Sequence, residues 1–145
     1  MIRIDRELDV GRPAEAVFDY LIDLRHLTEW QPGVQVAEQT TPGPLAVGSR
    51  FRLVMAGPAG PLEAEGEVTE LQRPSRLAVR SLSGPVDLEG SIDLEARGEQ
   101  TAVRIAASLQ PKGMLRFAES MIRGVVEREL PSALEKLREH LESKA

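Results

Sequence analysis

The fold is decided by residues 10–34, which read VGRPAEAVFDYLIDLRHLTEWQPGV. Gly11 and Pro13 turn the chain, and proline suits the first turn of a helix because its missing N–H has no partner there. Apolar residues then recur at helical spacing, which predicts a first helix. These residues are Ala14, Val17, Phe18 and Leu21. A second short helix is predicted from Asp23 to about Glu29, just before Trp30, the only tryptophan.

On both sides of this segment the chain alternates apolar and polar residues, the pattern of half-buried strands. Strands are predicted over residues 2–10, 34–39, 49–56, 62–70, 76–81, 86–96 and 101–110. Loops rich in proline and glycine interrupt them, most clearly at residues 40–48 and 57–61. The turn at residues 97–100 sets Leu94 opposite Val103, so the last two strands are expected to form a hairpin.

Residues 112–143 carry one long amphipathic pattern, which predicts a single C-terminal helix. Its apolar stripe consists of Leu115, Ala118, Ile122, Val125, Leu130, Ala133, Leu134, Leu137 and Leu141. Pro131 lies inside this helix and removes one hydrogen bond, so we expect a kink there. The whole chain, residues 1–145, is read as one domain with the order β-α-α-β-β-β-β-β-β-α.

This order resembles that of the helix-grip proteins, the START-like or SRPBCC superfamily, also called polyketide cyclase/dehydrase-like. The matching elements near the N-terminus are the proline that opens the helix, Val17-Phe18-Asp19-Tyr20-Leu21, Asp23 and Trp30-Gln31-Pro32-Gly33-Val34. The resemblance covers essentially the whole chain. It implies an α+β fold of the START/Bet v 1 type, in which a curved seven-stranded antiparallel sheet wraps around the long C-terminal helix. In that family the ligand cavity lies between sheet and helix.

The composition argues against several classes of protein. Without cysteine there is no disulfide framework and no thiolate metal site. No apolar run reaches about 18 residues, so no membrane span is predicted. A net charge of −5 and an aromatic content of 3% argue against nucleic-acid binding. The first residues do not resemble a signal peptide, so we expect a cytoplasmic protein, with monomer and homodimer both left open.

The sequence shows no catalytic constellation. His26 and His140, the two histidines, lack metal-ligand spacing, and we predict neither a metal nor a cofactor. No G-x-S-x-G motif and no glycine loop for phosphate is present. One alternative stays open at this point, in which His26 acts as an acid–base group at the mouth of the cavity.

Seven residues are the candidates for ligand contact: Arg6, Tyr20, Trp30, Phe51, Met55, Phe117 and Met121. By alternation Arg6 faces inward, where its planar fork suits a ligand carboxylate, phosphate or carbonyl. The alternatives are a structural ion pair or a guanidinium that reaches solvent at the sheet edge. Tyr20 and Trp30 would line the pocket or fill the core. Gly66 and Gly90 lie within strands, where glycine marks a bulge or a bend.

Three functions fit this sequence. The preferred hypothesis is binding or transport of an apolar or amphipathic small molecule, such as a lipid, polyketide or quinone-like compound. In this hypothesis the gate would be the helix at Pro131 and the loops at residues 42–48 and 57–61. The second hypothesis is a polyketide cyclase or dehydratase, as the resemblance allows. The third is an accessory module for a chaperone or for protein assembly, which predicts a filled core and an exposed apolar patch.

Overall fold

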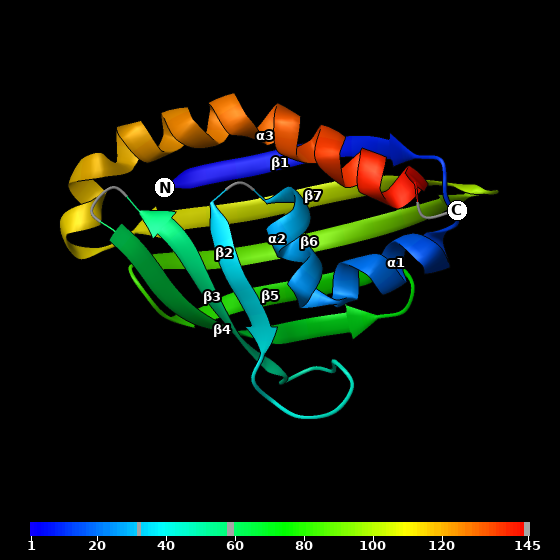
Figure 1. Cartoon of the computed structure of the whole chain (residues 1–145), viewed down its shortest axis with the longest axis horizontal. Helices are drawn as coiled ribbons and strands as arrows, with labels where there is room; N and C mark the ends of the chain where they lie inside the picture. The colour runs from blue at the N-terminus through cyan, green and yellow to red at the C-terminus, as the bar shows by residue number, and fades with distance from the viewer. Residues whose placement is uncertain (32, 58–59, 144–145) are drawn as a thin grey trace.

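The computed structural model describes residues 1–31, 33–57 and 60–143 and contains one antiparallel sheet with helices on one of its faces (Figure 1). The strands are β1 (Ile2–Val10), β2 (Val34–Gln39), β3 (Arg50–Gly57), β4 (Gly60–Gln72), β5 (Arg76–Ser83), β6 (Val86–Arg97) and β7 (Gln100–Pro111). The helices are α1 (Ala14–Ile22), η1 (Leu24–His26), α2 (Leu27–Trp30), η2 (Gly113–Ala118) and α3 (Glu119–Ser143), where η1 and η2 are 3₁₀-helices. The predicted order of elements and the predicted fold class are confirmed.

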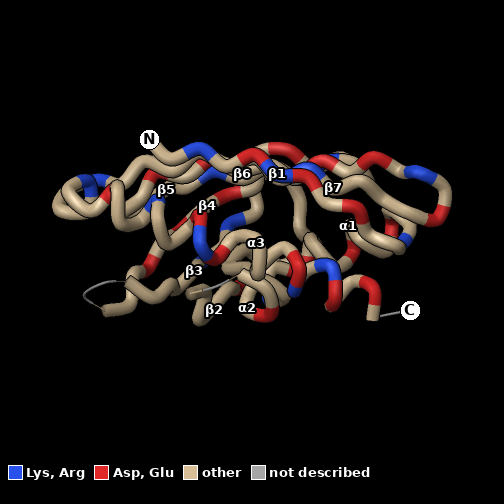
Figure 2. Tube along the Cα trace, turned by 90° about the horizontal axis from the view of Figure 1, so that it is seen from above, with Lys and Arg blue, Asp and Glu red and all other residues tan. Residues whose placement is uncertain are grey.

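Neighbouring strands follow the order β1-β7-β6-β5-β4-β3-β2, so β1 and β2 form the two edges. The predicted hairpin is confirmed, because Leu94 lies opposite Val103 in the β6–β7 register. The sheet curls strongly, and β2 and β3 come to lie on the same side as α2 and α3 (Figure 2). We call the face that the helices cover the inner face.

The curl of the sheet is accompanied by irregular pairing in β4. The β4–β5 register shifts between Glu65 and Gly66, as expected for a glycine at a bulge. Gly90, in contrast, pairs regularly with Val79 and Ala107, so the sheet has no bulge there. The two glycines therefore have different structural roles, although the sequence pattern around them is the same.

The hydrophobic core lies at one end of the molecule, where α1, α2 and the C-terminal half of α3 meet the sheet. Its buried members are Leu8, Val10, Val17, Phe18, Tyr20, Leu21, Trp30, Val68, Leu77, Leu94, Val103, Ala133, Leu137 and Leu141. Every residue of α3 that is buried belongs to this group, and the earliest of them is Ala133. The N-terminal half of α3 is therefore packed much less tightly than its C-terminal half.

The helices differ from the sequence prediction in two places. The predicted helix from Asp23 to Glu29 is divided into η1 and α2, and the Asp23 carboxylate caps η1 by accepting a hydrogen bond of 3.2 Å from the Arg25 amide. The predicted helix over residues 112–143 begins as η2, which follows Lys112 in extended conformation and starts at Gly113 with φ 58°. It continues as α3, which runs through Pro131 as one helix. No helix within the described residues is long and apolar enough to cross a membrane.

Candidate functional site

An apolar pocket lies on the inner face of the sheet, outside the packed core. It has a volume of about 60 Å³ and is formed by strands β3 to β7. The residues that line it are Phe51, Leu53, Met55, Leu62, Ala64, Glu65, Gly66, Ser81, Pro85, Val86, Leu88 and Leu109. Among the described residues of this lining, only Glu65 and Ser81 carry polar side chains, and Glu65 is an exposed residue. The pocket therefore suits hydrocarbon rather than a charged group.

The register between β3 and β4 shapes one wall of this pocket. Large residues on β3 lie opposite smaller ones on β4, with Phe51 facing Gly66 and Leu53 facing Ala64. A Cβ atom at Gly66 would lie 2.5 Å from Cζ of Phe51, closer than any ordinary contact. The Phe51 ring can thus lie over the β4 backbone only because residue 66 has no side chain.

Ser81 supplies the polar hydroxyl on the inner side of the pocket. Its Oγ accepts a hydrogen bond of 2.9 Å from the Leu88 amide, in place of a backbone partner. No acceptor for the Ser81 hydroxyl hydrogen is found among the described residues, so this hydrogen is available to a ligand oxygen. The sequence analysis missed Ser81, because a lone serine inside a strand carries no signal that separates it from any other.

The inner face around the pocket is only partly covered. Apolar residues that point toward the helices, including Ile105 and Leu109 on β7, are half-buried. The facing residues at the start of α3, Ile122 and Val125, are half-buried as well. Packing between the sheet and the helix is therefore looser here than at the other end, where Leu137 is completely buried.

Two of the seven predicted contact residues, Phe51 and Met55, line the pocket. Tyr20 and Trp30 instead belong to the packed core, with 5% and 4% of their surfaces exposed. The Tyr20 hydroxyl donates to Glu29 at 3.2 Å, and burial together with this carboxylate raises the pKa of Tyr20. The alternative that the sequence left open for these two aromatic residues, filling of the core, is the arrangement that the structure shows.

Arg6 lies on the predicted face of β1 but is not enclosed. It stands opposite Ile105 in the register, yet it is exposed, and its Nη1 donates to the Asp5 carbonyl at 2.9 Å. The reason is that β1 forms an edge of the sheet, where a long side chain can reach water. The expected ligand anchor is therefore a solvated guanidinium in this structure.

Neither Phe117 nor Met121 lines the pocket, and 80% and 54% of their surfaces are exposed. Both residues lie outside the apolar stripe of this segment, whose members Leu115, Ala118 and Ile122 are half-buried. The side chains of Phe117 and Met121 therefore face solvent.

His26, the acid–base alternative, is held by the core rather than turned toward the pocket. Its Nδ1 lies 2.7 Å from the Tyr20 carbonyl oxygen, and its ring stacks on Tyr20 with centroids 4.1 Å apart. Its Nε2 lies 3.9 Å from the Asp23 carboxylate. His26 therefore has structural partners on both ring nitrogens. No cluster of metal-ligating side chains occurs among the described residues.

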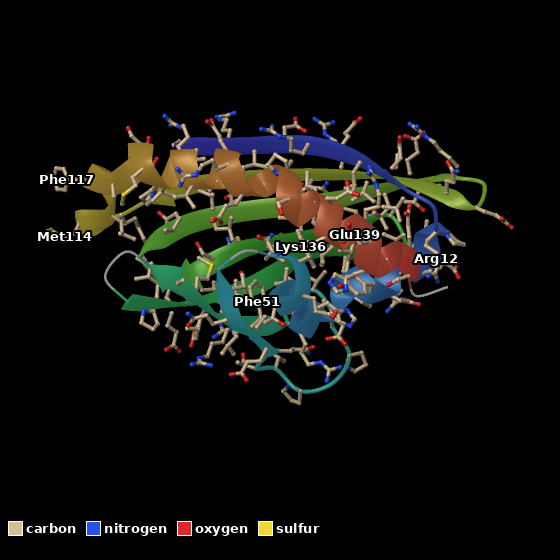
Figure 3. The ribbon with its side chains drawn as sticks, turned by 45° about the horizontal axis from the view of Figure 1, so that its top comes forward. Arg12, Phe51, Met114, Phe117, Lys136 and Glu139 are labelled. Atoms are coloured by element: carbon tan, nitrogen blue, oxygen red, sulfur yellow. The ribbon has the colours of Figure 1, made fainter. Side chains whose placement is uncertain are left out.

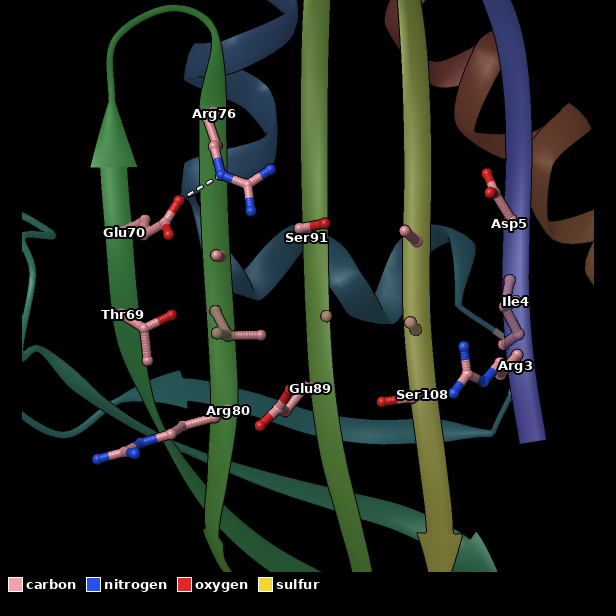
Figure 4. Close-up of a pocket in the computed structure, with 15 residues that line it drawn as sticks. Arg3, Ile4, Asp5, Thr69, Glu70, Arg76, Arg80, Glu89, Ser91 and Ser108 are labelled. Atoms are coloured by element: carbon pink, nitrogen blue, oxygen red, sulfur yellow. Dashed lines mark hydrogen bonds and ion pairs between the residues drawn. The ribbon is translucent and has the colours of Figure 1, made fainter. Parts of the chain in front are cut away.

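A larger depression of about 560 Å³ lies on the outer face of the sheet, across β1, β7, β6, β5 and β4 (Figure 4). Its floor is formed by small residues such as Ala78, Ser91 and Ala106, and its rim is charged. Several rim charges have ion-pair partners: Arg76 pairs with Glu70 on the rim and with Asp93 at 2.8 Å, and Asp5 pairs with Arg104 at 2.8 Å. This surface is wide, shallow and polar, so the enclosed apolar pocket is the better candidate for ligand binding.

Residues 1–142 match the protein family described as polyketide cyclase / dehydrase and lipid transport. The chain belongs to this family. The match spans the inner-face pocket and the core alike, and it agrees with the resemblance found in the sequence. No match was found among curated proteins.

Solved structures of similar fold include the protein TTHA0849 from Thermus thermophilus, with 18% identity, a TM-score of 0.80 and 99% of each chain covered. A START superfamily protein from Mycobacterium smegmatis has 13% identity, a TM-score of 0.78 and the same coverage. The Zhui aromatase/cyclase from Streptomyces sp. R1128 has 18% identity and a TM-score of 0.74, with 97% of this chain and 93% of that one covered. At such low identities these neighbours show a shared fold.

Proposed function

We propose that this member of the polyketide cyclase/dehydrase and lipid transport family binds an apolar or amphipathic small molecule in the inner-face pocket. The observation that carries the proposal is an apolar pocket on the inner face of the sheet, outside the packed core. A lipid, a polyketide or a quinone-like compound has the required chemistry. The cytoplasmic location and the choice between monomer and homodimer stay predictions.

The pocket must widen to hold such a ligand. Its volume is about 60 Å³, whereas pockets for drug-sized molecules have about 300–1,000 Å³. Neither η2 nor the start of α3 contains a buried residue, so these segments have few buried contacts to break. We therefore assign the opening movement to these two segments. The gate predicted at Pro131 and at the loops 42–48 and 57–61 stays a prediction, and residues 58–59 lie outside the described residues.

The binding energy would come from hydrocarbon removed from water, at roughly 25 cal/mol per Å² before the cost of ordering the ligand. One hydrogen bond from the Ser81 hydroxyl would orient a ligand oxygen. Because Ser81 contributes the one polar side-chain group on the inner side, the lining favours binding over acid–base catalysis. A cyclase of this family would in this case act mainly by holding a reactive chain in a folded conformation.

A titration with the fluorescent amphipathic probe anilinonaphthalene sulfonate tests this proposal with two matched variants. Leu88→Trp fills the pocket, and Glu89→Trp places the same side chain on the next residue, which is exposed on the outer face. We expect Leu88→Trp to weaken probe binding at least about tenfold, because the indole occupies the apolar volume that the probe needs. Glu89→Trp should bind the probe like the wild type.

The opposite pattern would overturn the proposal. If Glu89→Trp loses the probe and Leu88→Trp retains it, the outer depression is the binding site. Equal binding by both variants would place the site outside both surfaces. Circular dichroism of the two variants shows whether each retains the native fold.

A further inference from the structure

Three large apolar side chains project from the end of the molecule at η2 and the start of α3. Met114 is 84% exposed, Phe117 80% and Met121 54%. Figure 3 shows Met114 and Phe117 at the outermost end of the molecule, turned away from the sheet. We call these three residues the apolar tip. Such exposure is unusual for side chains of this size, which are normally buried in a soluble domain.

The helical geometry brings the apolar tip together on one surface. Met114 and Phe117 are three residues apart in a 3₁₀-helix, in which side chains at this spacing are eclipsed. Met121 follows Phe117 by four residues, the spacing of neighbours on an α-helix. The three side chains thus form a continuous ridge rather than scattered exposed positions.

One basic side chain beside the apolar tip has no acidic partner within the described part of the chain. Residues 112–123 contain three basic residues and one acidic residue, in a chain whose net charge is −5. Glu119, the acidic one, pairs with Arg123 at 3.2 Å, and Lys112 pairs with Asp87 on β6 at 3.0 Å. The Arg116 guanidinium lies 5.4 Å from the centroid of the Phe117 ring and has no carboxylate partner among the described residues. The ridge therefore combines exposed hydrocarbon with positive charge.

We propose that the apolar tip is a docking surface for an anionic phospholipid bilayer. Methionine and phenylalanine side chains can enter the boundary between headgroups and acyl chains while Arg116 contacts lipid phosphates. A second copy of the chain fits this surface less well, because contact between two tips would bring the Arg116 side chains together. A protein partner would need a groove that fits the projecting ridge. A bilayer needs no such groove, because its lipids can rearrange around the side chains.

The residue that precedes the segment carrying the apolar tip is hydrogen-bonded to the pocket lining. The Lys112 amide, which precedes η2, donates a hydrogen bond of 2.8 Å to the carbonyl oxygen of Pro85, a pocket residue. Contact between the tip and a bilayer would accordingly bring the pocket end of the molecule to the membrane. Docking itself requires no ligand in the pocket, so the two proposals can succeed or fail separately.

Vesicle flotation with the full chain tests the docking surface. The vesicles consist of phosphatidylcholine alone or of an equimolar mixture of phosphatidylcholine and phosphatidylglycerol. We expect the wild type to float with the anionic vesicles and Phe117→Ser to bind them about tenfold more weakly, since one aromatic side chain is lost from the interface. Arg116→Gln should weaken binding roughly fivefold, and added salt should reduce this difference.

Val47→Ser is the matched control, because Val47 is also exposed, at 62%, but lies in the loop between β2 and β3. It should bind vesicles like the wild type, and circular dichroism should show native folds for all the variants. The proposal is overturned if the wild type does not float, or if Phe117→Ser and Val47→Ser behave alike. It is also overturned if the wild type binds no vesicles but sediments as a dimer, and the Phe117→Ser variant sediments as a monomer. Flotation by a protein whose pocket binds no probe would support docking while contradicting the pocket proposal.

Discussion

Gly66 determines the shape of the pocket by having no side chain. The Phe51 ring occupies the space above it, and the Arg80 carbonyl oxygen would lie 2.8 Å from an added Cβ atom. The carbonyl belongs to the backbone of β5 and cannot move without disturbing the sheet. Position 66 is therefore limited to glycine by two independent contacts.

We expect Gly66→Ala to lower the free energy of unfolding by roughly 1–3 kcal/mol, the usual cost of overpacking. Gly90→Ala is the matched control, because the nearest heavy atom to an added Cβ is 3.8 Å away. That variant should be neutral, or more stable by up to about 1 kcal/mol, since glycine is unfavourable inside a strand. Urea denaturation of both variants measures the difference, and equal destabilisation would contradict this assignment.

Asp23 caps η1 and forms an ion pair with Arg25 within that helix. Its carboxylate accepts hydrogen bonds from the Arg25 side chain at 2.7 and 3.0 Å, and these hold the pKa of Asp23 below its ordinary value of 3.8. A lowered pKa in the folded state stabilises the protein above the unfolded-state pKa, and this stabilisation is lost as the pH falls through the folded-state pKa. The contribution is therefore complete at neutral pH.

We expect Asp23→Asn to cost about 0.5–1 kcal/mol of unfolding free energy at neutral pH, because this pair is partly exposed to solvent. The difference from the wild type should shrink as the pH is lowered below 3.8. Urea denaturation at several pH values measures it. The same substitution made in an Arg25→Gln background should have a smaller effect, and an unchanged effect there would rule out this ion pair as the cause.

Single residues also show where sequence reasoning fails. Alternation correctly assigned Phe51 and Met55 to the inner face, and both line the pocket. The same pattern assigned Arg6 to that face without indicating that its head reaches solvent. The period of a strand predicts which face of the sheet a side chain lies on. Whether that side chain is buried depends on which distant element covers the face, and a local sequence pattern does not contain this information.

At the scale of the element, α3 consists of two unequal halves. Its C-terminal half contributes Ala133, Leu137 and Leu141 to the core, and its N-terminal half contributes no buried residue. The amphipathic pattern is continuous through both halves, so the sequence predicted one amphipathic helix with a kink at Pro131 and did not indicate that its halves pack differently. The 3₁₀ start at Gly113 and the position of α3 along β1 decide the outcome instead.

We expect this inequality to appear in stability measurements. Leu137→Ala should cost about 2–5 kcal/mol, the range for leucine truncation in a packed core. Leu115→Ala, the same change at a half-buried position of η2, should cost less than about 1.5 kcal/mol, because less apolar surface is lost. Urea denaturation gives both values, and similar costs would show that η2 is packed as firmly as the C-terminal half of α3.

At the scale of the whole molecule, the sequence predicted the fold well. The seven strands, their order along the chain and the last hairpin all followed from alternation and turn residues, and the structure confirms them. The pocket was harder to predict, because five strands contribute to its lining and its volume depends on their curvature and pairing. Strand alternation predicts the face of each residue but not the space left between the side chains.

The central claim is that the inner-face pocket carries a small apolar or amphipathic molecule. Native mass spectrometry of gently purified protein, with and without incubation in a lipid and quinone extract, tests it most directly. The account predicts a discrete added mass that disappears on denaturation and is absent from Leu88→Trp. A protein that shows no added mass under either condition, or a Leu88→Trp variant that carries the same mass as the wild type, would contradict it.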